Sequence, residues 1–499
     1  MSVNIIGDKF SNITKLYPNK VALYFEKEKI TFKQLDSKSN QIVEWFIKNS
    51  IKKQDIVCIT SAKTPATFYI LIACLKYGLP YTFLDRKSPK IRNEKIINTL
   101  KPKIIFCDNL LYKDFFRIKN VKIKNINDFK KTFYNKKNYK NKKPTSVYSN
   151  DIAYIMFTSG STGTPKGVAI SHKNVINFIN WTKKRFQISK SDIFSNLNSL
   201  FFDNSVFDIY ASIFNGASLV PISRNQVIDP KTTINFLEKF KVTTWFSVPS
   251  LIIYFQKFDA FNKKSMKNLK KIIFGGEGFQ KNRLKSLYRI FKNRVKLVNV
   301  YGPTECTCIC STYEISEFDF KKNELYKLAP LGKSMVQGFY YKIMDENYRE
   351  VKKNEIGELY LGGDNVGLGY YNLKKETKLK FIQNPHQNNF KDVMYKTGDL
   401  VYRDSKTNLI YFSSRIDNQI KYMGYRIELG EVENVIGAVK GVNEVAVLFG
   451  KKNNTEEITC WISHNNKSVE NIKNSITRLL PVYMIPKRYI ELKHLPKNN

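Results

Sequence analysis

Histidine and cysteine are scarce in this chain, which has four histidines and seven cysteines in 499 residues. The cysteines are odd in number and include no Cys-x-x-Cys pair. This usage argues against a disulfide framework and favours a reducing compartment. Cys306, Cys308 and Cys310 alternate along a predicted strand, which turns them to one face, but no histidine lies near them in the sequence. We therefore expect no metal centre there.

Long hydrophobic runs are also absent. No uninterrupted apolar stretch approaches the roughly 18 residues of a membrane-spanning helix, and the first residues lack the basic-then-apolar pattern of a secretory signal. We expect a soluble, cytoplasmic protein without membrane insertion. Hydrophobic residues make up 42% of the 499 positions, which is enough to bury the cores of two or more domains.

Acidic residues are in the minority, at 43 against 83 lysines and arginines, which gives a net charge of +40. An excess of this size can indicate binding to nucleic acid or to an anionic membrane. The basic residues are scattered along the whole chain, however, so we prefer a general composition bias and predict no nucleic-acid partner. An attraction to acidic protein partners still follows. Residues 119–143 are basic and asparagine-rich, which predicts a surface loop or insertion, with a nucleic-acid-binding arm as the alternative.

Residues 1 to about 108 alternate between strand-like and helix-like segments. DIVCIT (55–60), YTFLD (81–85) and KIIFCD (103–108) are predicted strands, and PATFYILIACLKYG (65–78) is a predicted buried helix closed by glycine. This alternation favours a parallel sheet covered by helices, hence an α/β fold.

The most informative stretch is IAYIMFTSGSTGTPKG at 152–167. An apolar strand, 152–157, runs into hydroxyl residues, three glycines and Lys166. Glycines let backbone N–H groups face a ligand, hydroxyls add donors and the lysine adds a positive charge, which together suit phosphate. Pro165 stands where a Walker A loop needs a glycine, so the loop is of another kind.

This string resembles the phosphate loop of the adenylate-forming superfamily. That superfamily includes acyl-CoA synthetases, luciferases, adenylation domains of nonribosomal peptide synthetases, and D-alanine:carrier-protein ligases. The resemblance covers residues 10 to 496 and implies ATP and Mg²⁺ as cofactors. It implies nucleotide contacts from Thr158, Ser159, Gly160, Ser161, Thr162, Gly163 and Lys166.

Two later stretches, KIIFGGEGF (271–279) and LVNVYGPTEC (297–306), each run a strand into a glycine turn. In the second, Tyr301 offers an aromatic face to adenine, Thr304 a hydroxyl to the α-phosphate, and Glu305 a hard oxygen ligand to Mg²⁺. In YKTGDL, Asp399 offers two acceptor oxygens to the ribose diol, and a tight-turn aspartate is the alternative. The resemblance implies these same roles. It also implies catalytic roles for Lys166, Thr304, Glu305 and Asp417 and nucleotide contacts from Gly276, Glu277, Asn299, Gly302 and Arg415.

The segment FDNSVFD contains two acids, Asp203 and Asp208, within aromatic sequence. Both would be costly to bury unpaired, so at least one should have a cationic partner. The segment is similar to that of amino-acid-activating members of the superfamily, in which the aspartate at the Asp203 position pairs with the substrate ammonium group. The alternative is that Asp203 caps a helix beginning near Val206.

The resemblance also implies a pocket for the substrate side chain, and its lining is similar to that of pockets for branched aliphatic amino acids. Gly275 replaces a cysteine common in D-alanine ligases, which would enlarge the pocket. We predict a small or medium apolar amino acid. The implied pocket residues are Asp203, Asn204, Phe207, Phe246, Ile273, Gly275, Val300, Cys308 and Ile309.

Two domains are expected: a large AMP-binding domain at 1–413, with parallel or mixed sheets, helices and a β-subdomain, and a small mobile α+β domain at 414–499. SRIDNQIKYMGYRIELGEVE (414–433) resembles the hinge of the family, with Asp417 as the hinge residue. Ser414 and Met423 stand where members of the family more commonly have glycine and arginine. Members of the family normally continue past LPVYMIP with a Gly-Lys pair, and Lys497 is out of register with it. We therefore expect either a shortened C-terminal domain or an impaired first half-reaction.

Taken together, the sequence predicts an enzyme that activates an amino acid with MgATP to aminoacyl-AMP and pyrophosphate. It would then transfer the aminoacyl group to the phosphopantetheine thiol of an acidic carrier protein. The alternatives are a D-alanine:carrier-protein ligase, an acyl- or aryl-CoA ligase, and a non-catalytic nucleotide-binding protein.

Overall fold

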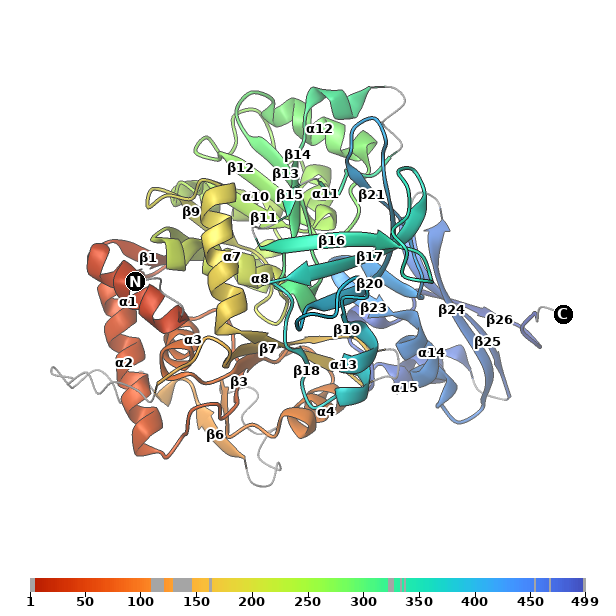
Figure 1. Cartoon of the computed structure of the whole chain (residues 1–499). Helices are drawn as coiled ribbons and strands as arrows, with labels where there is room; N and C mark the ends of the chain where they lie inside the picture. Colours follow the sequence, from red (N-terminus) through yellow and green to blue (C-terminus); the bar gives the residue numbers. More distant parts are fainter. Residues whose placement is uncertain are drawn as a thin grey trace.

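Two large sheets with helices around them form the body of the molecule, and a small lobe lies at one side (Figure 1). The computed structural model describes residues 5–108, 121–128, 146–160, 164–321, 327–332, 334–335, 338–452, 455–465 and 468–496. The architecture is mixed α/β, with mainly parallel large sheets and smaller antiparallel ones, as the sequence predicts.

The first large sheet has seven strands, in which β3 to β7 pair in parallel and β8 and β18 add antiparallel strands at one edge. All three strands predicted at the start of the chain lie in it. In order across the sheet they are β18 (Gly369–Tyr370), β8 (Lys166–Ser171), β7 (Ile152–Thr158), β4 (Tyr81–Phe83), β3 (Val57–Thr60), β5 (Ile104–Cys107) and β6 (Lys122–Asn125).

The second large sheet has nine strands, of which the six from β1 to β13 in the middle are parallel. In order they are β15 (Ser334–Met335), β14 (Ser311–Glu314), β13 (Lys296–Tyr301), β12 (Lys271–Gly275), β11 (Thr244–Ser247), β9 (Ile193–Asn196), β10 (Ser218–Pro221), β1 (Val21–Tyr24) and β2 (Lys29–Thr31). A third sheet is antiparallel and contains β16 (Phe339–Met344), β17 (Ile356–Gly363), β20 (Val393–Arg403), β19 (Phe381–Gln383) and β21 (Ile410–Arg415).

The helices form where local signals and apolar periodicity agree. In α3 (Pro65–Tyr77), Thr64 caps the first turn, Gly78 closes the last at φ 75°, and nearly every side chain is buried, as predicted. The other helices of the body are α1 (Ile6–Leu16), α2 (Phe32–Lys48), α4 (Lys90–Leu100), α7 (His172–Arg185), α8 (Asn204–Val206), η1 (Phe207–Ala211), η2 (Ile213–Asn215), α9 (Arg224–Val227), α10 (Pro230–Lys239), α11 (Pro249–Lys257), α12 (Lys281–Phe291), η3 (Thr304–Cys306), η4 (Glu317–Phe320) and α13 (Lys374–Lys380).

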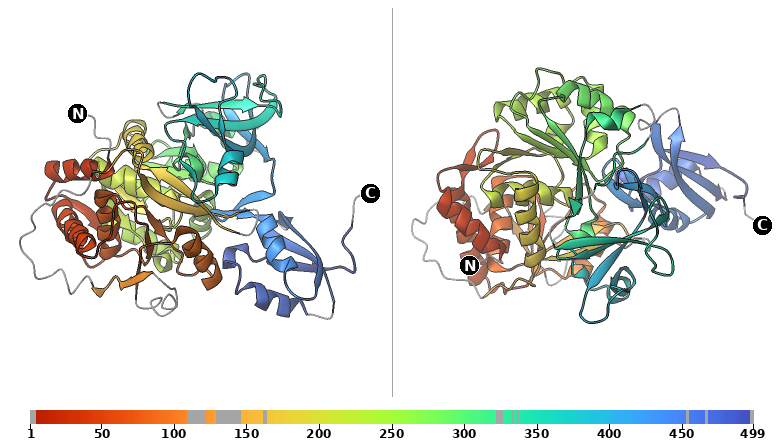
Figure 2. Two further views of the ribbon diagram at one scale, coloured as in Figure 1. Left: turned by 60° about the horizontal axis from the view of Figure 1, so that its bottom comes forward. Right: turned by 45° about the horizontal axis from the view of Figure 1, so that its top comes forward.

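Residues 419–491, which we call the C-terminal module, have a hydrophobic core of their own, from Tyr422 to Met484. The module contains β22 (Gln419–Tyr422), β23 (Tyr425–Glu428), α14 (Leu429–Gly437), β24 (Val442–Lys452), β25 (Thr455–His464), α15 (Val469–Ile476), η6 (Val482–Met484) and β26 (Arg488–Glu491). Figure 2 shows it as a separate lobe, with the C-terminus on its far side. The boundary at 413/414 and its mobility remain predictions.

Two predictions about local structure need correction. Cys306 ends the short helix η3, and Thr307 and Cys308 have left-handed backbones with φ 59° and 74°, so these cysteines do not share one strand. The turn brings the backbone of Cys308 so close to Gly302 that a side chain at position 302 would have no room. Within 119–143, residues 122–125 form the edge strand β6 rather than a loop; most of the rest of that segment lies outside the described residues.

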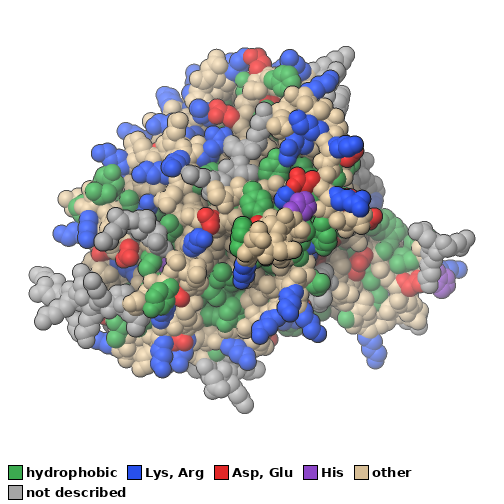
Figure 3. Space-filling view, in the orientation of Figure 1, with side chains coloured by type: hydrophobic (Ala, Val, Ile, Leu, Met, Phe, Trp, Pro, Cys, Tyr) green, Lys and Arg blue, Asp and Glu red, His purple; other side chains and the backbone are tan. Residues whose placement is uncertain are grey.

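The basic residues are spread over the visible face among hydrophobic and uncharged side chains rather than gathered in one patch (Figure 3). This distribution agrees with a general composition bias. Over the described ranges, none of the helices is both long enough and apolar enough to cross a membrane.

His172 gives the fold a predictable sensitivity to acid. Its Nδ1 accepts a hydrogen bond of 3.4 Å from the backbone N–H of Ile6, and burial lowers the pKa of the imidazole to about 4. Since the unfolded chain binds this proton near pH 6.5, the stabilisation is complete above that pH and is lost as the pH falls toward 4. Urea unfolding should show that a His172→Gln variant loses about 2 kcal/mol less stability than the parent between pH 7 and pH 5. Equal losses in parent and variant would contradict this assignment.

Candidate active site

A cavity of about 90 Å³ lies where the carboxyl ends of β13 and β7 meet the middle of β20 and the hairpin of β22 and β23. The carboxyl edge of parallel strands is the usual place for ligands in open α/β sheets. Residues from the body and from the C-terminal module both line the cavity. Among them are Thr158, Asp203, Thr304, Asp399, Arg415 and Arg426.

Asp203 faces this cavity from the start of α8. Its Oδ2 accepts a hydrogen bond of 2.6 Å from the hydroxyl of Thr304, which is the one donor to this carboxylate among the described residues. Burial raises the pKa of Asp203, and the Thr304 hydrogen bond opposes that rise. Asp203 makes no side-chain hydrogen bond to the amides of α8, so the capping alternative is wrong. The carboxylate therefore has acceptor capacity left for a cationic ligand.

Asp208 lies one turn further along and does not line the cavity. It accepts hydrogen bonds from the side-chain amides of Asn196 at 2.9 Å and Asn198 at 3.0 Å. Burial raises the pKa of Asp208 to about 7, and the nearby charge of Lys63 opposes that rise. Lys63 thus supplies a nearby positive charge for one of the two acids, and its Nζ donates to the backbone carbonyl of Asn196 at 2.6 Å.

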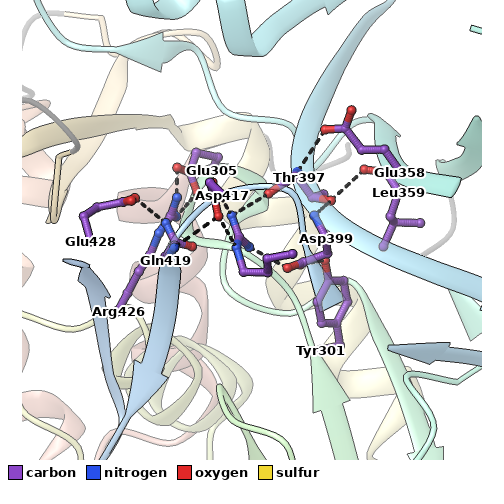
Figure 4. Close-up of polar contacts among 12 residues, drawn as sticks. Tyr301, Glu305, Glu358, Leu359, Thr397, Asp399, Asp417, Gln419, Arg426 and Glu428 are labelled. Atoms are coloured by element: carbon purple, nitrogen blue, oxygen red, sulfur yellow. Dashed lines mark hydrogen bonds and ion pairs between the residues drawn. The ribbon is translucent and has the colours of Figure 1, made fainter. Parts of the chain in front are cut away.

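Asp399 lies at the centre of a polar network (Figure 4). Its Oδ2 accepts a 2.6 Å hydrogen bond from the hydroxyl of Tyr301, and its Oδ1 accepts one of 2.5 Å from Nη1 of Arg415. The guanidinium of Arg415 also binds both oxygens of Asp417, at 2.6 and 2.9 Å. The structure therefore brings together four residues that the sequence assigned to the ribose, the adenine and the hinge.

Glu305 is fully buried and is held by groups from two directions. Its Oε1 accepts a 2.9 Å hydrogen bond from the hydroxyl of Tyr370, and Nη1 of Arg426 lies 3.0 and 2.9 Å from its two oxygens. Burial alone would raise the pKa of Glu305, but the charge of Arg426 and the hydrogen bonds hold it below its ordinary range. Glu305 is therefore ionised and already faces a cation.

The carboxylate of Glu305 would suit Mg²⁺ once Arg426 has moved away from its two oxygens. Magnesium takes one or two protein carboxylates and completes its shell with substrate phosphates and water. Among the described residues, no group of three or more Asp, Glu, His or Cys side chains is placed to hold a metal ion. Glu305 is the carboxylate that the sequence motif assigns to Mg²⁺. Lys166 is close by, since its Nζ lies 5.6 Å from the centre of the Tyr370 ring.

The described part of the phosphate loop contacts the C-terminal module. The hydroxyl of Ser159 donates to the carbonyl of Arg426 at 2.9 Å, and the N–H of Gly160 donates to Oε2 of Glu431 at 3.3 Å. The other oxygen of Glu431 accepts from Nη1 of Arg92 at 2.6 Å. Ser161, Thr162 and Gly163 lie outside the described residues. The carboxylate of Glu431 in the module thus accepts a hydrogen bond from Gly160, whose N–H was predicted to bind phosphate.

The remaining predicted nucleotide contacts divide into two groups. Gly276 and Gly302 line the cavity with Thr158 and Ser159. Glu277 instead accepts from the N–H groups of Gly424 and Ser250. Asn299 does not line the cavity, and its side-chain amide donates to the carbonyl of Pro330 at 2.9 Å.

The predicted side-chain pocket is closed. Phe207, Phe246, Val300, Cys308 and Ile309 are each at most 4% exposed. Gly275 does not enlarge the space, because a Cβ there would lie 2.3 Å from the carbonyl oxygen of Val300. The enlargement predicted from this glycine is therefore wrong: it serves the close approach of β12 to β13.

Sequence reasoning missed the residues through which the C-terminal module enters the site. These are Arg426, Glu431 and Lys421, whose Nζ lies 5.5 Å from the centre of the Tyr301 ring. Also missed were two residues of the body, Arg92, which binds Glu431, and Tyr370, which binds Glu305. Arg426 and Glu431 both stand in GYRIELGEVE, beside the predicted hinge. Four charged residues alternating with apolar ones in this stretch were the available signal.

Comparison with known proteins gives a consistent result. A profile of the family described as "AMP-binding enzyme" matches residues 10–371. Bacitracin synthase 1 of Bacillus licheniformis is 31% identical over 96% of this chain, which covers 9% of that protein. Gramicidin S synthase 1 of Brevibacillus brevis is 28% identical over 96% of this chain, which covers 42% of that protein. The chain thus spans less than half the length of these relatives.

Solved structures with the same fold include an artificially fused adenylation–PCP di-domain protein from Klebsiella oxytoca, NpsA-ThdA. Its TM-score is 0.86, with 21% identity, and the match covers 98% of this chain and 94% of that one. The adenylation domain AlmE of Vibrio cholerae, solved in complex with glycyl-adenosine-5′-phosphate, gives a TM-score of 0.83 with 19% identity, covering 100% of this chain and 96% of that one.

Proposed function

This chain belongs to the AMP-binding enzyme family, and on that premise we propose that it joins an amino acid to AMP and releases pyrophosphate. The phosphopantetheine thiol of an acidic carrier protein then attacks the aminoacyl carbonyl, which forms a thioester and releases AMP. Both the relatives that are peptide synthases and the adenylation–PCP fusion support this reaction class.

The single observation that carries the amino-acid assignment is the environment of Asp203. A carboxylate that faces a cavity and has one neutral donor is a site for a cation. A fatty or aryl acid offers no cation to this group, whereas an amino acid offers its ammonium. An acyl- or aryl-CoA ligase is for that reason the weaker alternative.

In the proposed reaction, a carboxylate oxygen of the amino acid attacks the α-phosphorus of ATP and pyrophosphate leaves. The attack needs neutralised phosphate charge more than it needs a general base. Asp203 holds the ammonium and so aims the carboxylate. The hydroxyl of Thr304, which donates to Asp203 in this structure, would donate to a phosphate oxygen when ATP is bound. When bound, Mg²⁺ supplies positive charge to the phosphates, and Glu305 is the residue that would hold it.

The contacts of the C-terminal module suit the second step rather than the first. Arg426 is paired with the carboxylate of Glu305, which would bind the metal. Glu431 accepts a hydrogen bond from the backbone N–H of Gly160, which would bind phosphate. Both must leave before MgATP binds there, and both can return once pyrophosphate has left. The module would thus serve transfer to the thiol in the arrangement described here.

Pyrophosphate release by the full chain tests the proposal. The panel contains small, branched and charged amino acids, the matching acids without an amine, and an acid-free control. Dependence on amino acids is the expected result. Dependence on the amine-free acids would favour a CoA ligase, and silence with every acid would favour a nucleotide-binding protein without catalysis.

Replacing Glu431 tests the role of the module in transfer. A Glu431→Gln variant weakens both the ion pair with Arg92 and the hydrogen bond from Gly160. We expect the ratio of aminoacyl transfer to adenylate formation to fall by about 10-fold, with pantetheine as the thiol acceptor. Glu470→Gln, at an exposed position in the first turn of α15, is the matched control. An unchanged ratio in Glu431→Gln would count against the role.

A further inference from the structure

Asp208 is a buried acid that the proposed reaction does not use. It is 0% exposed and does not line the cavity. It lies in η1, a π-helical turn that follows α8 without a break, and Asp203 at the start of α8 already has a helical backbone. Such turns are rare and often occur beside functional sites. Asp203 and Asp208 thus belong to one helical stretch, with the first residue at the cavity and the second inside the protein.

Two asparagines tie Asp208 to the second large sheet. The side-chain amides of Asn196, at the end of β9, and Asn198, in the loop after it, donate to Oδ2 of Asp208 at 2.9 and 3.0 Å. The amide of Asn198 also donates to the carbonyl of Phe246 in β11 at 3.1 Å. The helical stretch therefore cannot turn about its axis without breaking these hydrogen bonds.

Lys63 connects the same cluster to the first large sheet. It lies between β3 and α3, and its Nζ donates to the backbone carbonyl of Asn196 at 2.6 Å. Burial lowers the pKa of Lys63 and raises the pKa of Asp208, and the attraction between the two charges opposes both shifts. Oδ1 of Asp208 accepts no hydrogen bond from the described residues, so the charge of Lys63 compensates for its burial.

The carboxylate of Asp203, in contrast, is held by a single side-chain contact. The hydroxyl of Thr304 is its one donor among the described residues, and a hydroxyl rotates to suit its partner. The direction of this carboxylate is therefore set by the helical stretch that carries it. A shift of about 1 Å in a binding group can lower the rate of a reaction by about 100-fold.

We propose that Asp208 is a positioning residue that, together with Asn196 and Asn198, holds the helical stretch so that Asp203 directs its carboxylate at the substrate ammonium. The inference rests on the proposed function and adds to it a residue that lies outside the cavity. Because Asp208 acts through Asp203, its loss should weaken recognition of the amine and leave the nucleotide contacts unchanged.

Binding of alanyl and propionyl sulfamoyladenosine, stable acyl-adenylate analogues that differ by the amine, tests the inference without requiring turnover. Calorimetry on the full chain should show that the parent prefers the alanyl compound and that Asp208→Ala lowers this preference by at least about 10-fold. The affinity for the propionyl compound should stay within about 2-fold of the parent, because this ligand has no ammonium for Asp203. An unchanged preference in Asp208→Ala, or an equal loss of affinity for both compounds, would overturn the inference. A parent without any preference for the alanyl compound would instead overturn the proposed function.

Two further variants separate positioning from a general loss of stability. Asp208→Asn keeps an acceptor for the two amides and should retain the preference to within about 3-fold of the parent. Asp319→Ala removes an equally buried carboxylate in η4, which pairs with Lys281 at 3.1 Å, and should leave the preference as in the parent. A loss in either variant as large as that in Asp208→Ala would overturn the role given to these hydrogen bonds.

Asn198→Ala takes the place of Asp208→Ala if the latter fails to fold. Asn198 is half-buried, and its amide bridges Asp208 and β11, so its removal loosens the same stretch at a smaller cost in packing. A fall in the preference for the alanyl compound of at least about 3-fold is expected, since one of the two hydrogen bonds to Asp208 is lost. The parental preference in a folded Asn198→Ala variant would overturn the inference.

Discussion

Replacing Asp203 with alanine should lower kcat/KM for the amino acid in pyrophosphate exchange by about 100- to 1,000-fold, since truncating one member of a buried charge pair costs 2–5 kcal/mol. The KM for ATP should change by less than about 2-fold, because Asp203 contacts Thr304 and not the nucleotide itself. A general loss of folding would instead affect both substrates. The selective loss is the signature of an ammonium site.

The ionisation of Asp203 adds a test by pH. Burial raises the pKa of this carboxyl above its ordinary range, and only the ionised form attracts an ammonium. On acidification, kcat/KM for the amino acid should therefore fall at a higher pH than an exposed aspartate would cause. Asp203→Asn keeps the shape and an acceptor for Thr304 but carries no charge, so it should lose this limb of the profile. An unchanged profile in Asp203→Asn would show that another group titrates.

Replacing Glu305 with glutamine should lower the rate of adenylate formation by about 100-fold, because a metal acting on phosphoryl oxygens is worth several kcal/mol. The same variant should need more Mg²⁺ for half-maximal exchange and should show a smaller Mg²⁺-dependent thermal shift in the presence of ATP. Its hydroxyl partner Tyr370 can still bond to the amide, which limits damage to the fold.

The partner of Glu305 provides the matched comparison. Arg426→Met removes the guanidinium from the carboxylate and so should not raise the Mg²⁺ requirement, whereas its transfer to pantetheine should fall. The two variants break the same contact from opposite ends. An equal rise in the Mg²⁺ requirement in both would contradict the role given to Glu305.

Much of the fold follows from local sequence signals. The strands before residue 108 and the buried helix α3 obey short-range rules of periodicity and capping. The strand through Cys306 and Cys308 was predicted from alternation alone. It is wrong because the backbone turns left-handed at Thr307 and Cys308, which alternation does not encode.

The contacts of the site also divide into those that local sequence motifs predict and those that depend on long-range packing. Asp203 and Thr304 were assigned to neighbouring roles from their motifs and meet at 2.6 Å. The contact of Arg426 with Glu305 joins residues 121 positions apart, and that of Glu431 with Gly160 joins residues 271 apart. Such pairs depend on how the C-terminal module docks, and no local pattern reports that. The closed pocket was missed for a related reason, since a glycine in a sequence does not reveal which neighbour fills its space.

The most direct test of the ammonium site is a cycle that removes the amine from the ligand and the carboxylate from the protein. Alanyl and propionyl sulfamoyladenosine differ by the amine, and their affinities would be measured on the parent and on Asp203→Ala. The account predicts that the parent prefers the alanyl compound by about 100-fold and that the variant shows almost no preference, a coupling of roughly 2–3 kcal/mol. The same preference in both proteins would contradict it.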